Sequence, residues 1–154
     1  MRYWLMKSEP DSYSIDDLAA KSPAMWEGCR NYTVRNFFRD SMSVGDMAFF
    51  YNSNSNPSGI AGLMRIVSEA YPDPTQFDPS SHYFDAKSPM DAPRWLLRDV
   101  AFVQKFDRVI SLAELREIPG LQGMEVVKRG QRLSVLPVTE AEWQIIMELP
   151  GLGG

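Results

Sequence analysis

The sequence has very little cysteine and histidine: Cys29 and His82 are the only ones among 154 residues. A single cysteine cannot form an internal disulfide, so a reducing, cytoplasmic or nucleoid-associated location is expected. A structural zinc site needs four cysteine or histidine ligands, so no metal is expected either. The fold must therefore be stabilised by packing, which a chain of this length can supply as one domain, residues 1–154.

Long apolar runs are also missing. No stretch approaches the length of about eighteen apolar residues that a membrane helix needs, and the first residues lack the charged-then-apolar order of a secretory signal. We therefore expect no membrane partner.

The net charge is −4 at pH 7, so the molecule as a whole repels a polyanion. Any contact with nucleic acid must therefore be local. The alternative for the basic clusters is that they balance the acidic surface. The clusters are Arg30, Arg35 and Arg39, and Lys128, Arg129 and Arg132.

The common catalytic motifs are absent as well. The sequence has no glycine-rich dinucleotide or phosphate loop and no nucleophile elbow, so we expect no cofactor and no enzymatic activity. Cys29 could meet His82 only through the fold, and His82 lies in a proline-rich segment, residues 71–93. The aspartates scattered through that segment favour turns over a magnesium site.

Short strand and helix signals alternate along the chain and predict a mixed α+β domain. The apolar run of residues 47–51 and the run of 60–67 are separated by turn residues and predict a long hairpin. Residues 71–93 are predicted to form an irregular surface loop. Further strands are predicted at 3–6, 95–109 and 132–138, and helices at 15–18, 32–41, 112–115 and 140–146. Because no strand–helix–strand repeat is seen, we expect a small β-barrel decorated with short helices.

Aromatic residues next to small polar ones are abundant. Trp26 precedes a polar stretch, Tyr51 precedes Asn52-Ser53-Asn54, and Trp95 follows an arginine. Flat rings and amides suit a nucleobase, since stacking on an aromatic ring contributes roughly 1–3 kcal/mol per base and amides can read its edge. Packing in the core is the alternative, and composition leaves it open for Trp26 and Trp95.

The order of these motifs resembles that of the EVE-domain family. The resemblance rests on Trp26-x-Gly28-x-Arg30-Asn31-Tyr32-x-x-Arg35-Asn36 and Phe50-Tyr51-Asn52-Ser53-Asn54, and continues in residues 3–10, 93–95 and 127–138. It implies a PUA-like β-barrel, akin to the YTH reader domain. It also implies a pocket for a modified base, notably methylated or hydroxymethylated cytosine in DNA, or a modified RNA base. This sequence departs from the family at Cys29, where valine is common, and at Asn52, where histidine is usual.

Together these features predict a nucleic-acid-binding module, a monomer, that holds one flipped base in an aromatic pocket. The candidate pocket residues are Trp26, Asn31, Tyr32, Tyr51, Ser53, Asn54 and Trp95. The candidates for the rim, where flanking phosphates bind, are Arg30, Arg35, Arg129 and Arg132. For Arg30 and Arg35 a structural role is equally open. The alternative functions are a module that binds a peptide in the same groove, and an enzyme acting on a modified nucleotide or RNA.

Overall fold

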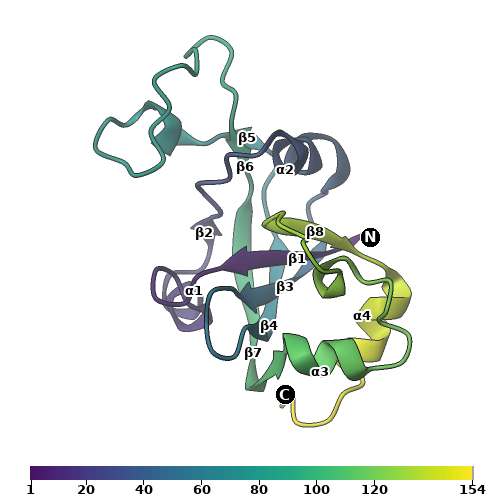
Figure 1. The fold of residues 1–154 in the computed structure, drawn as a ribbon. Helices are drawn as coiled ribbons and strands as arrows, with labels where there is room; N and C mark the ends of the chain where they lie inside the picture. The colour runs from purple at the N-terminus through teal and green to yellow at the C-terminus, as the bar shows by residue number, and fades with distance from the viewer. Residues whose placement is uncertain (154) are drawn as a thin grey trace.

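A computed structural model describes residues 1–153, and its centre is a six-stranded sheet with the order β2-β7-β4-β3-β1-β8. β1 runs parallel to β3, and all other neighbours in this sheet are antiparallel. The strands are β1 (Tyr3–Ser8), β2 (Ala24–Met25), β3 (Met47–Asn52), β4 (Gly59–Ile66), β7 (Asp99–Ser111) and β8 (Val135–Val138). The mixed sheet with helices at its margins is the α+β architecture predicted, with the barrel only half closed (Figure 1).

Short helices connect the strands, and side-chain caps define where most of them begin. Ser14 and Thr139 each form a capping box with the residue three positions on, as the sequence predicts. The segment predicted as one helix at 32–41 is helical throughout, but its second half widens into a π-helix. The helices are α1 (Ile15–Lys21), α2 (Tyr32–Asn36), η1 (Phe37–Ser41), η2 (Pro74–Phe77), α3 (Leu112–Glu117), η3 (Glu125–Val127) and α4 (Glu140–Met147). No helix within residues 1–153 has the length and hydrophobicity to cross a bilayer.

The two faces of the sheet bury separate apolar clusters, because successive side chains of a strand point to opposite sides. Leu5 and Phe49 face one cluster, which also contains Trp143 of α4. Met6 and Phe50, their neighbours in β1 and β3, face the other cluster. The second cluster is the one that matters below, and we call it the α1–α2 face: it includes Trp4, Met6, Leu18, Trp26, Val34, Phe38 and Phe50.

The segment between β4 and β7 projects from the body of the molecule (Figure 1). It begins with β5 (Tyr71–Pro72) and ends with β6 (Leu96–Leu97), which pair with each other. The segment is largely irregular, as predicted, but it is not only surface: Asp73 and Gln76 are both 0% exposed. The strand predicted at 95–109 is interrupted, because Arg98 separates β6 from β7.

Candidate functional site

Polar groups from four segments meet where the parallel strands β1 and β3 end. Ser8 and Asn52 are partners in the register of these strands. The Ser53 N–H donates to the Ser8 carbonyl at 2.9 Å, and the Ser8 hydroxyl donates to the Tyr13 carbonyl at 2.6 Å. The Lys7 N–H donates to the Ser134 carbonyl at 2.8 Å, which brings the segment before β8 to the same strand end. We call these four residues, Ser8, Tyr13, Asn52 and Ser134, the inner group, together with Cys29, whose sulfur contacts the Ser134 hydroxyl.

Two atoms of the inner group are buried without a hydrogen-bond partner among the described residues. They are the Tyr13 hydroxyl and Asn52 Oδ1. An unpaired buried polar group costs about 1–3 kcal/mol, and nearly all such groups in folded proteins are paired. Each of the two atoms is therefore a position where a ligand or an ordered water can supply the missing partner.

Cys29 lies at the inner group with its sulfur 3.9 Å from the Ser134 hydroxyl oxygen. Burial raises the pKa of the Cys29 thiol to about 11. The thiol is therefore protonated at neutral pH, which does not suit a nucleophile or a metal ligand. Within residues 1–153, no three histidine, cysteine or acidic side chains lie close enough to hold a metal ion.

Trp26 packs into the core of the α1–α2 face. Its side chain is 7% exposed, and its ring stands edge-on to Phe50 with the centroids 5.6 Å apart. The Trp26 N–H donates to the Arg98 carbonyl at 3.1 Å. The alternative that the sequence leaves open for this ring, packing in the core, is therefore the role that the structure shows. Trp26 forms part of the apolar floor beside the inner group.

Arg30 joins the segment after Trp26 to the projecting segment. Its Nε and Nη2 donate to the Tyr83 carbonyl at 3.1 and 2.9 Å, and Nη2 also donates to Thr75 Oγ1 at 3.0 Å. Its Nη1 donates to the Cys29 carbonyl at 3.1 Å and to Asp73 Oδ2 at 3.0 Å. Every N–H of the guanidinium is thus engaged within the protein. Arg30 has no donor left for a phosphate, and its role is the structural one.

Asp73 is the buried partner of this arginine. Its carboxylate accepts hydrogen bonds from the Gly28 N–H at 2.8 Å and from the Thr75 N–H at 2.9 Å, besides that from Arg30. Burial alone would raise the pKa of Asp73, but the hydrogen bonds from Gly28, Thr75 and Arg30 outweigh it and lower the pKa. Asp73 is therefore ionised at neutral pH and holds the two segments together.

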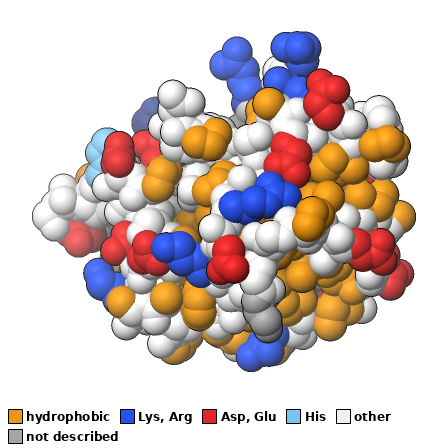
Figure 2. Space-filling model, turned by 90° about the horizontal axis from the view of Figure 1, so that it is seen from below, with side chains coloured by type: hydrophobic (Ala, Val, Ile, Leu, Met, Phe, Trp, Pro, Cys, Tyr) orange, Lys and Arg blue, Asp and Glu red, His pale blue; other side chains and the backbone are white. Residues whose placement is uncertain are grey.

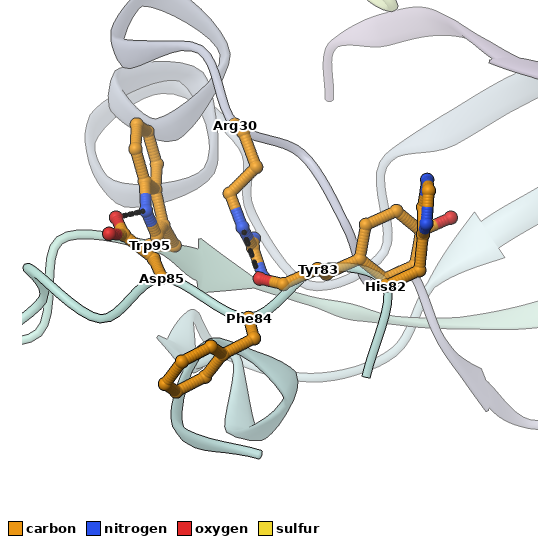
Figure 3. Close-up of a pocket in the computed structure, with 6 residues that line it drawn as sticks. All are labelled: Arg30, His82, Tyr83, Phe84, Asp85 and Trp95. Atoms are coloured by element: carbon orange, nitrogen blue, oxygen red, sulfur yellow. Dashed lines mark hydrogen bonds between the residues drawn. The ribbon is translucent and has the colours of Figure 1, made fainter. Parts of the chain in front are cut away.

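A pocket of about 300 Å³ opens on the outer side of Arg30 (Figure 3). It is lined by Arg30, His82, Tyr83, Phe84, Asp85 and Trp95, and we call it the outer pocket. The Trp95 indole N–H donates to Asp85 Oδ2 at 2.7 Å. The ring of Tyr32 packs on Trp95 at a tilt of 34° with the centroids 4.9 Å apart, and the Arg35 guanidinium lies 4.7 Å from the centre of the Tyr32 ring. The structure thus brings together Tyr32, Arg35 and Trp95, but at the outer pocket.

The remaining pocket candidates are spread over the molecule. Asn31 caps α2, where its side-chain oxygen accepts from the Val34 N–H at 3.1 Å. The Asn54 side chain is exposed and donates to Glu9 at 2.7 Å, while Ser53 adjoins the inner group through its backbone. Tyr51 belongs to the cluster on the opposite face of the sheet, so the structure does not bring it to either site.

The other two basic candidates, Arg129 and Arg132, are exposed and form no ion pair or side-chain hydrogen bond within residues 1–153. Their guanidinium groups are therefore free to contact a ligand, in contrast to that of Arg30.

Comparison with known proteins identifies the fold. The model of the EVE domain matches residues 2–149. The chain belongs to the EVE-domain family. Mouse thymocyte nuclear protein 1 is 46% identical over 166 aligned positions, which cover 96% of this chain and 73% of the mouse protein. The predicted family is thus confirmed.

Solved structures agree with this assignment. A protein from Pseudomonas putida superposes with a TM-score of 0.91 at 53% identity, covering 94% of this chain and 97% of the other. Human THYN1, in a complex with DNA that contains 5-methylcytosine, superposes with a TM-score of 0.89 at 43% identity, covering 96% of both chains. The predicted fold class, a mixed sheet with a few short helices, is confirmed by these neighbours.

Sequence reasoning missed part of the inner group of this EVE domain. Ser8 and Asn52 stand inside the quoted family motifs, so their strand-end positions could have been combined into a site. Tyr13 carries no local signal: only its burial without a partner identifies it. Ser134 lies in the strand predicted at 132–138 and within a family motif, but its contact with Cys29 joins positions far apart in the chain.

Gly28 is a position where this EVE domain requires glycine. Its φ is +90°, and a Cβ atom there would lie 2.5 Å from Cζ of Tyr83. We expect Gly28→Ala to lower the free energy of unfolding by about 2 kcal/mol, from backbone strain and displacement of the Tyr83 ring. Urea unfolding, monitored by circular dichroism, measures this change in the free energy of unfolding.

Gly45→Ala is the matched control, because Gly45 has a φ of +98° and no neighbour within 4 Å of its added Cβ. We expect a smaller loss there, and the double variant Gly28→Ala/Tyr83→Ala should recover the difference. Equal losses at the two glycines would show that the contact with Tyr83 contributes nothing.

Proposed function

We propose that this EVE domain binds DNA and recognises one flipped base of the methylated cytosine class. The observation that carries the proposal is its likeness to human THYN1, which was crystallised with DNA containing 5-methylcytosine and aligns with 96% of this chain at 43% identity. A shared fold alone would not imply a shared ligand. Sequence identity of 43% over nearly the whole chain supports a shared ligand.

The inner group supplies chemistry that suits the edge of cytosine. The exocyclic amino group of cytosine is a donor, and its ring nitrogen and carbonyl oxygen are acceptors. The unpaired Asn52 Oδ1 is an acceptor and the unpaired Tyr13 hydroxyl is a donor. Enzymes that flip a base read its edge by hydrogen bonds of this kind while apolar rings cover its faces. Trp26 and Phe50 provide the neighbouring apolar surface.

A base reaches these atoms only if part of the surrounding wall moves, because both are buried in the free chain. We propose that the moving part is the segment from Glu27 to Arg30, between the buried Trp26 and the cap of α2. It has no regular secondary structure, and hydrogen bonds from Gly28 and Arg30 to Asp73 tie it to the projecting segment. Flipping the base itself costs a few kcal/mol. The measured binding free energy is therefore the free energy of the new contacts minus the cost of flipping the base and of moving the wall.

Phosphate contacts are assigned to exposed arginines outside the pocket. Arg129 and Arg132 lie just before Ser134 in the sequence, and they carry the proposed phosphate role that Arg30 cannot take. The net charge is −4, and basic and acidic side chains are interspersed on the face drawn in Figure 2. This distribution favours a small local contact with DNA over a broad electrostatic one.

A binding module accounts for the inner group better than an enzyme does. The Cys29 thiol is protonated, and its side-chain contact is the Ser134 hydroxyl, which is not a general base. Binding to RNA, a monomeric state and a cytoplasmic or nucleoid location stay predictions. A peptide ligand is the alternative that the following experiment also tests.

Tyr13→Phe is expected to weaken binding to a 5-methylcytosine probe about tenfold, the effect of one lost hydrogen bond. It should leave the free energy of unfolding unchanged or higher, because the hydroxyl it removes has no partner in the free protein. Fluorescence polarisation at fixed salt measures the affinity, with single- and double-stranded DNA and RNA probes that carry one cytosine or one 5-methylcytosine.

Tyr51→Phe is the matched control, because it removes a hydroxyl from the opposite face of the sheet. It should leave the affinity unchanged. A loss in Tyr51→Phe but not in Tyr13→Phe would place the base on the other face. If the wild type binds no probe, the peptide alternative gains support and the proposed function fails.

A further inference from the structure

The exposed aromatic rings of this protein gather in one place. Among residues 1–153 the exposed large aromatic side chains are Tyr32, Tyr83 and Phe84, which are 51%, 37% and 42% exposed. Tyr83 and Phe84 line the outer pocket, and Tyr32 packs at a tilt against Trp95 in its wall. Exposure of large rings costs hydration free energy, so a cluster of them on a small domain indicates a binding surface.

The segment that carries these rings is held in place by a buried network. The Gln76 side-chain amide donates to the carbonyls of Asp73 and Trp95 at 2.7 and 2.8 Å. Its oxygen accepts from the Ser88 hydroxyl at 2.6 Å and from the Trp95 N–H at 3.1 Å. Gln76 is 0% exposed. The rings are therefore presented by an ordered framework, which lowers the entropic cost of binding a ligand.

The outer pocket adjoins the inner group through a shared stretch of backbone. The Tyr83 ring lies directly over Gly28, where an added Cβ would come within 2.5 Å of it. Gly28 precedes Cys29 of the inner group, and Arg30 follows. Residues 28–30 thus have the inner group on one side and the outer pocket on the other.

The chemistry of the outer pocket favours a flat, uncharged ring. The Arg30 guanidinium lies 5.7 Å from the centres of both the Tyr83 and the Trp95 rings. Its N–H groups are all engaged, so it has no donor to offer to a charged ligand. The Asp85 carboxylate in the wall disfavours a phosphate. Aromatic rings and arginine planes are the surfaces on which proteins stack unpaired bases.

We infer that the outer pocket stacks a second nucleobase, the one next to the flipped base on the same strand. This inference rests on the proposed function, because the second base is placed by the first. The volume of the outer pocket, about 300 Å³, lies at the lower end of the range of small-ligand sites. A volume of this size suits one base. The two sites differ in what they recognise: the inner group reads an edge, and the outer pocket accepts any base by its face.

Phe84→Ala tests the inference with single-stranded DNA probes that carry one 5-methylcytosine. One probe has all its bases, and two others have an abasic site directly 5′ or 3′ of the modified cytosine. For the wild type, we expect one of the abasic probes to bind about tenfold more weakly than the full probe, as for the loss of one stacked base. Phe84→Ala should bind the full probe about tenfold more weakly, and the same abasic site should then cause no further loss. The preference for 5-methylcytosine over cytosine should be unchanged.

Two further variants keep the test interpretable. Phe84→Leu retains an apolar side chain without the aromatic face and should behave like the alanine variant. Met90→Ala removes a side chain from the same segment that is 80% exposed and does not line the pocket, and it should bind as the wild type does. If the losses of affinity caused by Phe84→Ala and by the abasic site add independently, the inference is overturned. The preference for 5-methylcytosine over cytosine, and with it the proposed function, would be unaffected by that outcome. If the wild type shows no preference for 5-methylcytosine, the proposed function itself fails.

Discussion

Trp26→Ala is expected to lower the free energy of unfolding by about 3–5 kcal/mol, the usual cost of removing a buried large aromatic ring. The Trp26 ring is 7% exposed and packs edge-on against Phe50 within the apolar cluster of the α1–α2 face. The truncation leaves a cavity between α1, α2 and the sheet. Urea unfolding monitored by circular dichroism gives the difference directly.

Trp26→Phe is the control, because it preserves an aromatic ring and should lose a smaller amount. A loss below about 1 kcal/mol in Trp26→Ala would contradict the assignment of this ring to the core. Weak binding by Trp26→Ala would report a damaged fold as readily as a lost stacking surface, so Tyr13→Phe is the cleaner probe of the inner group.

Asp73→Ala is expected to cost about 3 kcal/mol, the lower end of the range for breaking a buried ion pair, because the remaining Arg30 side chain is 22% exposed and keeps its other acceptors. The substitution would leave the Arg30 charge without its carboxylate and the N–H groups of Gly28 and Thr75 without their acceptor. Denaturant unfolding measures the loss. We also expect the projecting segment to become more sensitive to proteolysis, since Asp73 ties it to the body.

The control for Asp73→Ala is an ion pair on the surface. Asp16 lies 2.9 Å from the Lys105 ammonium, and the two side chains are 69% and 54% exposed. Exposed pairs of this kind contribute about 0–1 kcal/mol, so Asp16→Ala should be nearly neutral. Equal effects of the two substitutions would show that burial of Asp73 does not determine its contribution.

The contribution of Asp73 should depend on pH. Its pKa in the folded protein is lowered below the ordinary value of 3.8. A group with a lowered folded pKa stabilises the native state at pH values above its ordinary pKa, and this stability is lost as the pH falls through the folded value. The stability difference between the wild type and Asp73→Asn should therefore be constant near neutral pH and should narrow below 3.8. A difference that widens in acid would contradict this.

Features that depend on neighbouring residues could be predicted from the sequence. The hairpin of β3 and β4 follows from two apolar runs around a turn, and the capping boxes at Ser14 and Thr139 follow from residue types three positions apart. The motifs around Trp26 and Asn52 were enough to indicate the family and, through it, the fold. Strand division at Arg98 was missed, because the apolar alternation continues across it.

The sequence by itself thus determined the longer elements, the family and the class of ligand to consider, since periodicity, caps and motifs are local properties of a chain. Tertiary structure alone decided which side chains share a site. Tyr51 and Asn52 are neighbours in the sequence but point to opposite faces of the sheet. Whether Arg30 could bind a phosphate depended on Asp73 and Tyr83, which accept hydrogen bonds from its guanidinium. Both lie more than forty positions away in the sequence. Hydrogen-bond partners and burial are set by the packing of distant segments, and no local pattern records them.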